Sequence, residues 1–126
     1  KNFLIIGILF CGLAVIFGAF GAHSLNDKIP DQSITSFKTG VQYQFLHGLA
    51  LIMLSFCSYL FKEKLKAIGN LFAVGTLLFS GSIYLLTTHS ITGIGTSILG
   101  PLTPIGGSLL IIAWFLWLWK AVKWKN

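Results

Sequence analysis

Four long apolar runs, separated by short polar segments, dominate the hydrophobic pattern of this chain. They cover about residues 3–22, 42–61, 68–88 and 104–120. Each run is close to the roughly 20 residues that an α-helix needs to cross the hydrocarbon core of a bilayer. The alternating pattern of transmembrane β-strands is absent. Helices are then the remaining way to satisfy the backbone hydrogen-bonding groups in lipid. The pattern therefore predicts an all-α polytopic membrane protein, a single domain over residues 1–126 with four transmembrane helices in an antiparallel bundle.

The segment before the second run has the features of a helix start. Asp31 or Ser33 is a candidate N-cap just after Pro30, and apolar residues recur from there at helical spacing. A helix from Asp31 to the end of the run would be about 45 Å long. Its first turns must therefore lie outside the hydrocarbon or along its surface.

The segment between the third and fourth runs, HSITGIGTSILGPLTPIGG, has no charged residue but keeps several apolar ones. A loop of this length and composition usually packs against something, as a lid or as a short interfacial helix. The other interpretation is an apolar loop that lies on the rim of the bundle. Both interpretations remain open at this point.

Composition and charge agree with a membrane protein and predict its orientation. Hydrophobic residues make up 55% of the chain, charged residues make up 10%, and the mean hydropathy is +0.83. All nine basic residues are lysines, and four crossings would put seven on one side: Lys1, Lys62, Lys64, Lys66, Lys120, Lys123 and Lys125. The positive-inside rule then predicts that both termini are cytoplasmic. Membrane lipids are the expected partners of these lysines, and nucleic acid is not expected to bind.

Polar side chains inside the runs concentrate in the half of the bundle opposite the seven lysines, which is the outer leaflet. Counting residues along each helix places the following set there: His23, Tyr43, Gln44, His47, Ser80, Ser82, Tyr84 and Thr103. Polar groups are costly in hydrocarbon unless they face the bundle interior or a cavity, so we expect these side chains to converge. They form either interhelical hydrogen bonds, worth about 0.6 kcal/mol each, or the lining of a ligand site.

Residue types and spacings do not indicate catalysis or a bound metal. No Asp or Glu lies within an apolar run, which disfavours a transporter that depends on a membrane carboxylate. The histidines show no HxxxH or HxxH pair, and no CxxCH motif occurs, so we expect neither a metal nor haem. No nucleophile has an evident base and orienting acid. We therefore expect no catalytic residue and no cofactor.

Small residues in the runs are candidates for close helix contact, because packing rather than hydrophobicity drives helix association in lipid. They are Ala14, Gly18, Gly21 and Ala22 in the first run, Gly81 in the third, and Gly106 and Gly107 in the fourth. Thin bundles with such faces often complete their burial with a partner. A homo-oligomer or a larger membrane complex is therefore expected.

Four short segments carry a resemblance to a known family. In chain order they are GAFGAH, TGVQYQFLHGLAL, LLFSGSIYLL and TPIGG. In order and spacing they closely resemble the YgdD/YwdK family of small four-span membrane proteins, over nearly the whole chain. The resemblance implies this fold and a bacterial inner-membrane location. The family is a domain of unknown function, so the resemblance implies no activity, cofactor or catalytic residue. His89 and the long Gly-rich loop after it are less typical of the family.

Two functions agree with these features. We expect a small inner-membrane protein with a structural, accessory or membrane-stabilising role and without enzymatic activity. The alternative is the binding or transport of a lipid-like or quinone-like small molecule in an outer-leaflet cavity around His47. An enzyme that uses His47 as a base is the weakest interpretation, because no activated nucleophile accompanies it.

Overall fold

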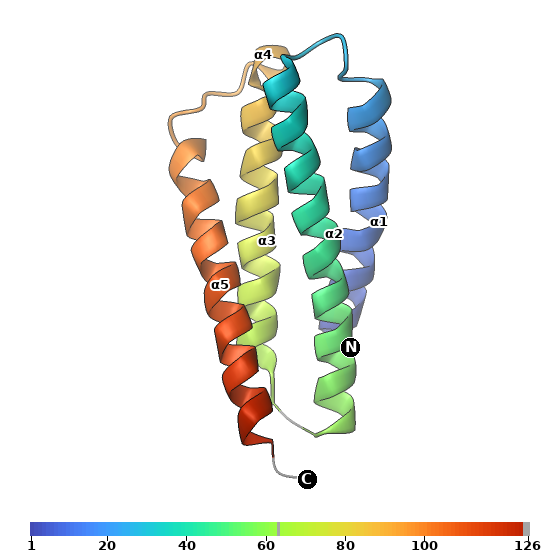
Figure 1. The fold of residues 1–126 in the computed structure, drawn as a ribbon, viewed down its shortest axis with the longest axis vertical. Coiled ribbons are helices and arrows are strands. Elements are labelled where there is room, and N and C mark those ends of the chain that lie inside the picture. Colours follow the sequence, from blue (N-terminus) through green and yellow to red (C-terminus); the bar gives the residue numbers. More distant parts are fainter. Residues whose placement is uncertain (63, 125–126) are drawn as a thin grey trace.

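Helices are the regular elements of the part of the chain that the computed structural model describes, residues 1–62 and 64–124. Its elements are α1 (Asn2–His23), α2 (Asp31–Leu60), α3 (Lys66–Thr87), α4 (His89–Thr92) and α5 (Leu99–Lys123). All except the short α4 are long and apolar enough to cross a membrane, and they run antiparallel along one axis (Figure 1). The predicted all-α membrane fold with four transmembrane helices is confirmed.

The second long helix begins where the sequence predicts, but its N-cap differs. Pro30 takes the N-cap position with a ψ of 148°, and no side chain caps the helix. The carbonyl oxygen of Pro30 accepts hydrogen bonds from the amides of Ser33 and Ile34 at 2.8 and 3.1 Å. Asp31 and Ser33 are therefore helical residues and not caps. The extended backbone of Pro30 puts the change from loop to helix at the proline itself.

The last long helix begins at Leu99, several residues before the predicted span. Two prolines lie in its first two turns without ending it. Pro101 stands in the first turn, where an amide has no partner within the helix in any case. Pro104 lies inside the helix and removes one backbone hydrogen bond, the one to the carbonyl of Gly100. The prolines thus mark the start of α5 rather than a break before it.

The uncharged segment between α3 and α5 lies on the rim of the bundle and does not form a lid. Its only regular element among the described residues is α4, which ends at Gly93 with a φ of 70°, a conformation that favours glycine. Ile91, Ile94 and Ile98 are 52%, 42% and 76% exposed. Of the two interpretations left open by the sequence, the apolar rim loop is the one that the structure supports.

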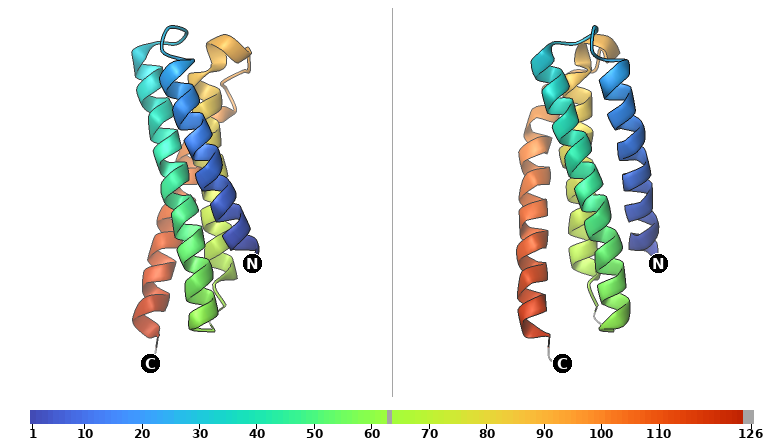
Figure 2. Two further views of the ribbon diagram at one scale, coloured as in Figure 1. Left: turned by 90° about the vertical axis from the view of Figure 1, so that its right-hand side faces the viewer. Right: turned by 45° about the vertical axis from the view of Figure 1, so that its right-hand side comes forward.

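Each long helix packs mainly against its neighbour in the sequence. The contacts join α1 to α2, α2 to α3 and α3 to α5, whereas α1 meets α3 only briefly and does not meet α5. The helices therefore form a staggered row with α2 and α3 in the middle, which can be followed in Figures 1 and 2. As the edges of this row, α1 and α5 leave broad apolar faces exposed.

The buried core runs along the middle of this row. Its main cluster contains Phe10, Ala50, Leu51, Leu54, Leu65, Ile68, Phe72, Leu110 and Ala113. A second cluster joins the loop after α1 to the first turns of α2, through Leu25, Ile29, Ile34 and Phe37. The early turns of α2 are thus packed by the loop before them, which explains why this helix starts well before its apolar run.

Two glycine pairs let helix backbones touch. A Cβ on Gly7 of α1 would lie 2.6 Å from the carbonyl oxygen of Gly48 in α2. A Cβ on Gly106 of α5 would lie 2.9 Å from the carbonyl oxygen of Gly75 in α3 and would collide with the backbone nitrogen of Phe79. Side-chain atoms essentially never approach backbone this closely, so only glycine fits at these crossings.

The small residues selected from the sequence differ in their surroundings. Ala14 is 2% exposed, and a Cβ on Gly21 would lie 2.8 Å from the Phe37 ring. Added Cβ atoms on Gly18 and Gly107 would make ordinary contacts at 3.5 Å. Ala22 is exposed, and nothing lies within 4 Å of a Cβ on Gly81, so these two do not make the expected close contacts. The contact between α1 and α2 passes through Gly7 and Gly48 instead, while Gly81 faces a gap between α1 and α3.

We predict that Gly106→Ala destabilises the fold and that the neighbouring Gly107→Ala does not. The new methyl group would meet backbone atoms at the first position and only the Phe79 ring at the second. The expected cost is about 1–3 kcal/mol for Gly106→Ala and less than about 0.5 kcal/mol for Gly107→Ala. Unfolding in mixed micelles with increasing sodium dodecyl sulfate measures both. Equal midpoints for the two variants would show that α3 and α5 do not touch there.

Candidate functional site

Gln44 joins three helices through its side-chain amide. Its Nε2 donates to the carbonyl oxygen of Phe10 in α1 at 2.9 Å, and its Oε1 accepts from the hydroxyl of Tyr84 in α3 at 2.8 Å. The side chain is 6% exposed. Because both ends of the amide are bonded, Gln44 holds α2 to α1 and to α3 at the same level.

Ser80 makes a second link between α3 and α2. Its Oγ donates to the carbonyl oxygen of Gly40 at 2.7 Å. Gly40 permits this approach, because a Cβ there would lie 2.9 Å from the Tyr84 ring. The same ring contacts Phe17 and Phe37 at centroid distances of 5.1 and 4.9 Å. Gln44, Ser80 and Tyr84 therefore form a packed junction of α1, α2 and α3.

His47 is buried between α2, α3 and α5, and both of its ring nitrogens are engaged. Its Nδ1 lies 2.7 Å from the carbonyl oxygen of Tyr43, and its Nε2 lies 3.2 Å from the indole Nε1 of Trp114. A carbonyl can only accept and an indole N–H can only donate, so the imidazole carries its proton on Nδ1 and is neutral. No lone pair or N–H of His47 is left for a substrate.

Aromatic rings pack against the imidazole of His47. The Tyr43 ring stacks on the imidazole at 5.8 Å and contacts the Phe79 ring at 4.7 Å. The Trp114 ring packs on Phe72 at 5.0 Å. Tyr43 itself is 42% exposed, so it forms the outer wall of this group rather than part of the buried core.

A third contact ties α3 to the first turns of α5. The hydroxyls of Ser82 and Thr103 lie 2.6 Å apart, and Ser82 also donates to the carbonyl oxygen of Phe79 at 3.0 Å. Since the Ser82 proton goes to that carbonyl, Thr103 is the donor between the two hydroxyls. This bond connects the two helices near the end of the bundle that carries α4.

The remaining histidines do not join these contacts. His23 is exposed at the end of α1, away from these contacts. His89 is exposed, and its Nδ1 donates to the carbonyl oxygen of Leu86 at 2.8 Å. The described residues contain no group of three or more His, Cys, Asp or Glu side chains that could hold a metal.

Apart from His23, the polar residues singled out from the sequence thus lie in three separate contacts instead of one convergent cluster. Gln44 and His47 are three residues apart, which rotates them about 60° from each other around α2. With α3 between them, one side chain points toward α1 and the other toward α5. Trp114 and the Phe10 carbonyl are partners that the sequence analysis missed. A buried indole N–H usually has a hydrogen-bond acceptor, so a tryptophan within an apolar run could have been predicted to pair with a polar side chain.

Nearly all buried polar atoms are used inside the bundle. Among the described residues, Trp124 Nε1 is the one buried side-chain nitrogen or oxygen without a hydrogen-bond partner. The three contacts therefore act as interhelical ties. Open space lies beside them and not within them.

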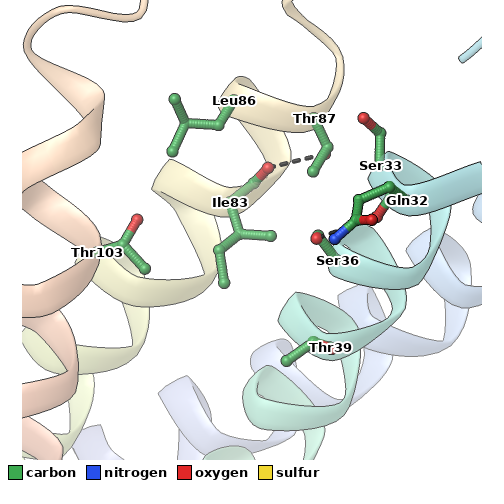
Figure 3. A pocket seen from close by; sticks show the side chains of 8 residues that line it. All are labelled: Gln32, Ser33, Ser36, Thr39, Ile83, Leu86, Thr87 and Thr103. Carbon is green, nitrogen blue, oxygen red and sulfur yellow. Dashed lines mark hydrogen bonds between the residues drawn. The ribbon is translucent and has the colours of Figure 1, made fainter. Parts of the chain in front are cut away.

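A groove runs beside His47 between α2 and α5, with α3 as its floor. One part of it, about 680 Å³ in volume, is lined by Gln42, Tyr43, Leu46, His47, Phe79, Gly107, Leu110, Ile111 and Trp114. One turn nearer the rim, the same three helices line a second part of about 310 Å³, shown in Figure 3. Its side chains belong to Gln32, Ser33, Ser36, Thr39, Ile83, Leu86, Thr87 and Thr103.

The outer part of the groove is polar but uncharged. Ser36 and Thr39 donate to the carbonyls of Gln32 and Thr35, and Thr87 donates to the carbonyl of Ile83 (Figure 3). Their hydroxyl protons are therefore used within their own helices. The oxygen lone pairs that face the groove remain as hydrogen-bond acceptors.

Comparison with known proteins identifies relatives over nearly the full length. The family described as "Protein of unknown function (DUF423)" matches residues 17–107. The chain is 44% identical to the UPF0382 membrane protein YwdK of Bacillus subtilis (strain 168), over 98% of each chain. It is 40% identical to the UPF0382 membrane protein SAB0533 of Staphylococcus aureus (strain bovine RF122 / ET3-1), over 92% of this chain and 91% of that protein. No solved structure matches the chain.

We predict that Gln44→Leu destabilises the bundle and that Gln42→Leu, two residues away on the exposed side of α2, does not. The first change removes two interhelical hydrogen bonds and leaves the Tyr84 hydroxyl without its acceptor. The expected cost is about 1–3 kcal/mol, against less than about 0.5 kcal/mol for Gln42→Leu. Unfolding in mixed micelles again measures both changes.

Tyr84→Phe provides the matched test of the same bond. It should cost less in the Gln44→Leu background than in the wild type, because the acceptor is already missing there. A Gln44→Leu variant as stable as the wild type would contradict the assignment of Gln44 as an interhelical tie.

Proposed function

Because the chain belongs to the DUF423 family, whose relatives named above are membrane proteins, we propose that it is a structural or accessory protein of the bacterial cytoplasmic membrane and not an enzyme. The observation that supports this is the saturation of its buried polar groups. Catalysis needs a base, acid or nucleophile with a free position toward a substrate. In this bundle the polar side-chain atoms of His47, Gln44 and Ser80 are already hydrogen-bonded to other groups of the protein.

The proposal includes an orientation. The start of α1 and the end of α5 lie at the same end of the bundle (Figure 1), and Lys1, Lys62, Lys64, Lys66 and Lys123 are at that end. The opposite end has only Lys28 and Lys38 beside Asp27 and Asp31. By the positive-inside rule, the end with more lysines is cytoplasmic.

Assembly with other membrane proteins, or with further copies of the chain, is the proposed mode of action. The outward faces of the edge helices support it, since Val15 of α1 and Phe115 of α5 are 63% and 67% exposed. Lipid can cover such faces, but a second set of helices covers them equally well. A rigid row of four tied helices with two free edges is suited to lateral association.

We expect a photocrosslinking amino acid on one of these faces to capture another protein. With p-benzoylphenylalanine in place of Val15 or Phe115, irradiation of native membranes should give an adduct of higher mass from at least one position. The same replacement at the exposed Lys38, away from the apolar faces, is the control. A monomer alone in bilayer discs, together with no protein adduct from either face, would contradict the proposal.

A second candidate function is the binding or transport of a lipid-like or quinone-like molecule beside His47. The groove between α2 and α5 favours it, because its volume and its largely apolar lining are those of small-molecule sites. In this candidate the ligand would lie against Tyr43, Phe79 and Trp114, and would not bond to the saturated imidazole.

If this groove is occupied, protein purified in mild detergent should carry a bound amphiphile that mass spectrometry detects. Gly107→Leu places a side chain in the groove and should lower the amount severalfold. Gly81→Leu adds the same side chain facing the other gap, between α1 and α3, and should not. Equal amounts of bound amphiphile in the two variants would rule the groove out as the site.

A further inference from the structure

A basin lies where α1 and α3 begin and α2 ends, three helix ends that Figure 1 shows toward the same end of the bundle. Its volume is about 620 Å³, and it is formed by these three helix ends and the segment just before α3. It is far along the helices from His47 and takes no part in the interhelical hydrogen bonds described above. Its size is sufficient for a lipid headgroup or a comparable small molecule.

The rim of this basin is strongly basic. Lys1 comes from the start of α1, Lys64 from the segment before α3, and Lys66 from the first turn of α3. Asn2 and Asn70 add side-chain amides that can donate hydrogen bonds. None of the described residues that line the basin carries a carboxylate. The chemistry of the rim is therefore that of a site for an anion.

Backbone groups add to this positive potential. Helix α3 begins at the basin, and it has neither a side-chain cap nor an acidic residue in its first turn. Its first amide N–H groups have no acceptor within the helix, and its N-terminus carries a partial positive charge. An anion held by the lysines would also lie close to these amides.

The floor of the basin is apolar. Its accessible surface comes from Phe3 and Ile6, which are partly exposed and lie beside the buried Leu54 and Leu65. The Phe3 ring lies directly against Gly69, where an added Cβ would be 2.5 Å from it. A free inorganic ion would leave this floor in contact with water. A lipid would cover it with its glycerol backbone and the first carbons of its chains.

We propose that this basin binds the phosphate group of an anionic phospholipid from the leaflet at the lysine end of the bundle. Lysines that only anchor a membrane protein are spread along its flank, as Lys62 and Lys123 are, outside the basin. Lys1, Lys64 and Lys66 instead meet around one hollow at the ends of three membrane helices. Basic pockets between helices on this side of a membrane are the usual chemistry for anionic headgroups.

The test is native mass spectrometry of the full chain in a neutral detergent, titrated with phosphatidylglycerol or with phosphatidylcholine. The wild type should retain phosphatidylglycerol in preference to phosphatidylcholine. The double variant Lys64→Gln, Lys66→Gln should weaken phosphatidylglycerol binding by about tenfold or more, because each lysine near an anionic headgroup contributes severalfold. The control Lys62→Gln, Lys123→Gln removes the same charge from the same end and should change binding by less than about threefold.

Three results would overturn the proposal. The first is equal retention of the two lipids by the wild type. The second is an equal loss of binding in the basin variant and the control, which would assign the effect to general surface charge. The third is displacement of phosphatidylglycerol by inorganic phosphate at comparable concentration, which would assign the basin to a free anion. Equal unfolding midpoints for the two double variants exclude a folding defect as the cause.

Discussion

Backbone contact at glycine pairs is the constraint on which the rest of this bundle depends. Lipid chains are as apolar as leucine, so apolar side chains alone do not hold helices together in a membrane. Gly7 against Gly48 and Gly75 against Gly106 bring the helix axes close enough for dense packing. The same closeness puts interhelical hydrogen bonds within reach, such as the one from Gln44 to the Phe10 carbonyl. Packing and polar contacts therefore reinforce each other along the row of helices.

The polar contacts have a consequence for chemistry. A histidine buried in a membrane segment is a functional candidate by default. Here the indole of Trp114 takes its remaining lone pair, and the carbonyl of Tyr43 takes its proton. A protonated imidazole would turn the Trp114 contact into one between two donors, so the arrangement favours the neutral ring. His47 thus stabilises the junction of α2 and α5 and is poorly placed to act on a substrate.

The two ends of the bundle present different surfaces. Hydroxyls and amides without charge line the groove at one end, while lysines surround an apolar floor at the other. Both hollows exist because the helices form a staggered row that is not closed between α2 and α5 or between α1 and α3. The part of the groove nearer the rim and the basin are both lined by residues close to helix ends. Because only the basin carries lysines, it is the opening proposed to bind an anionic lipid.

The sequence by itself determined the number and approximate limits of the membrane helices, because hydrophobic length is a local property of the chain. It also determined the uneven distribution of lysines and the concentration of polar residues in one half. Only the tertiary structure decided which polar groups meet. Gln44 and Tyr84 are 40 residues apart and His47 and Trp114 are 67 apart, so their pairing depends on how each helix is rotated about its axis. That rotation is set by the glycine crossings. Helix rotation also decides which small residues touch a neighbouring helix. Gly7 and Gly106 do so, whereas Ala22 and Gly81 do not, and composition cannot distinguish these positions.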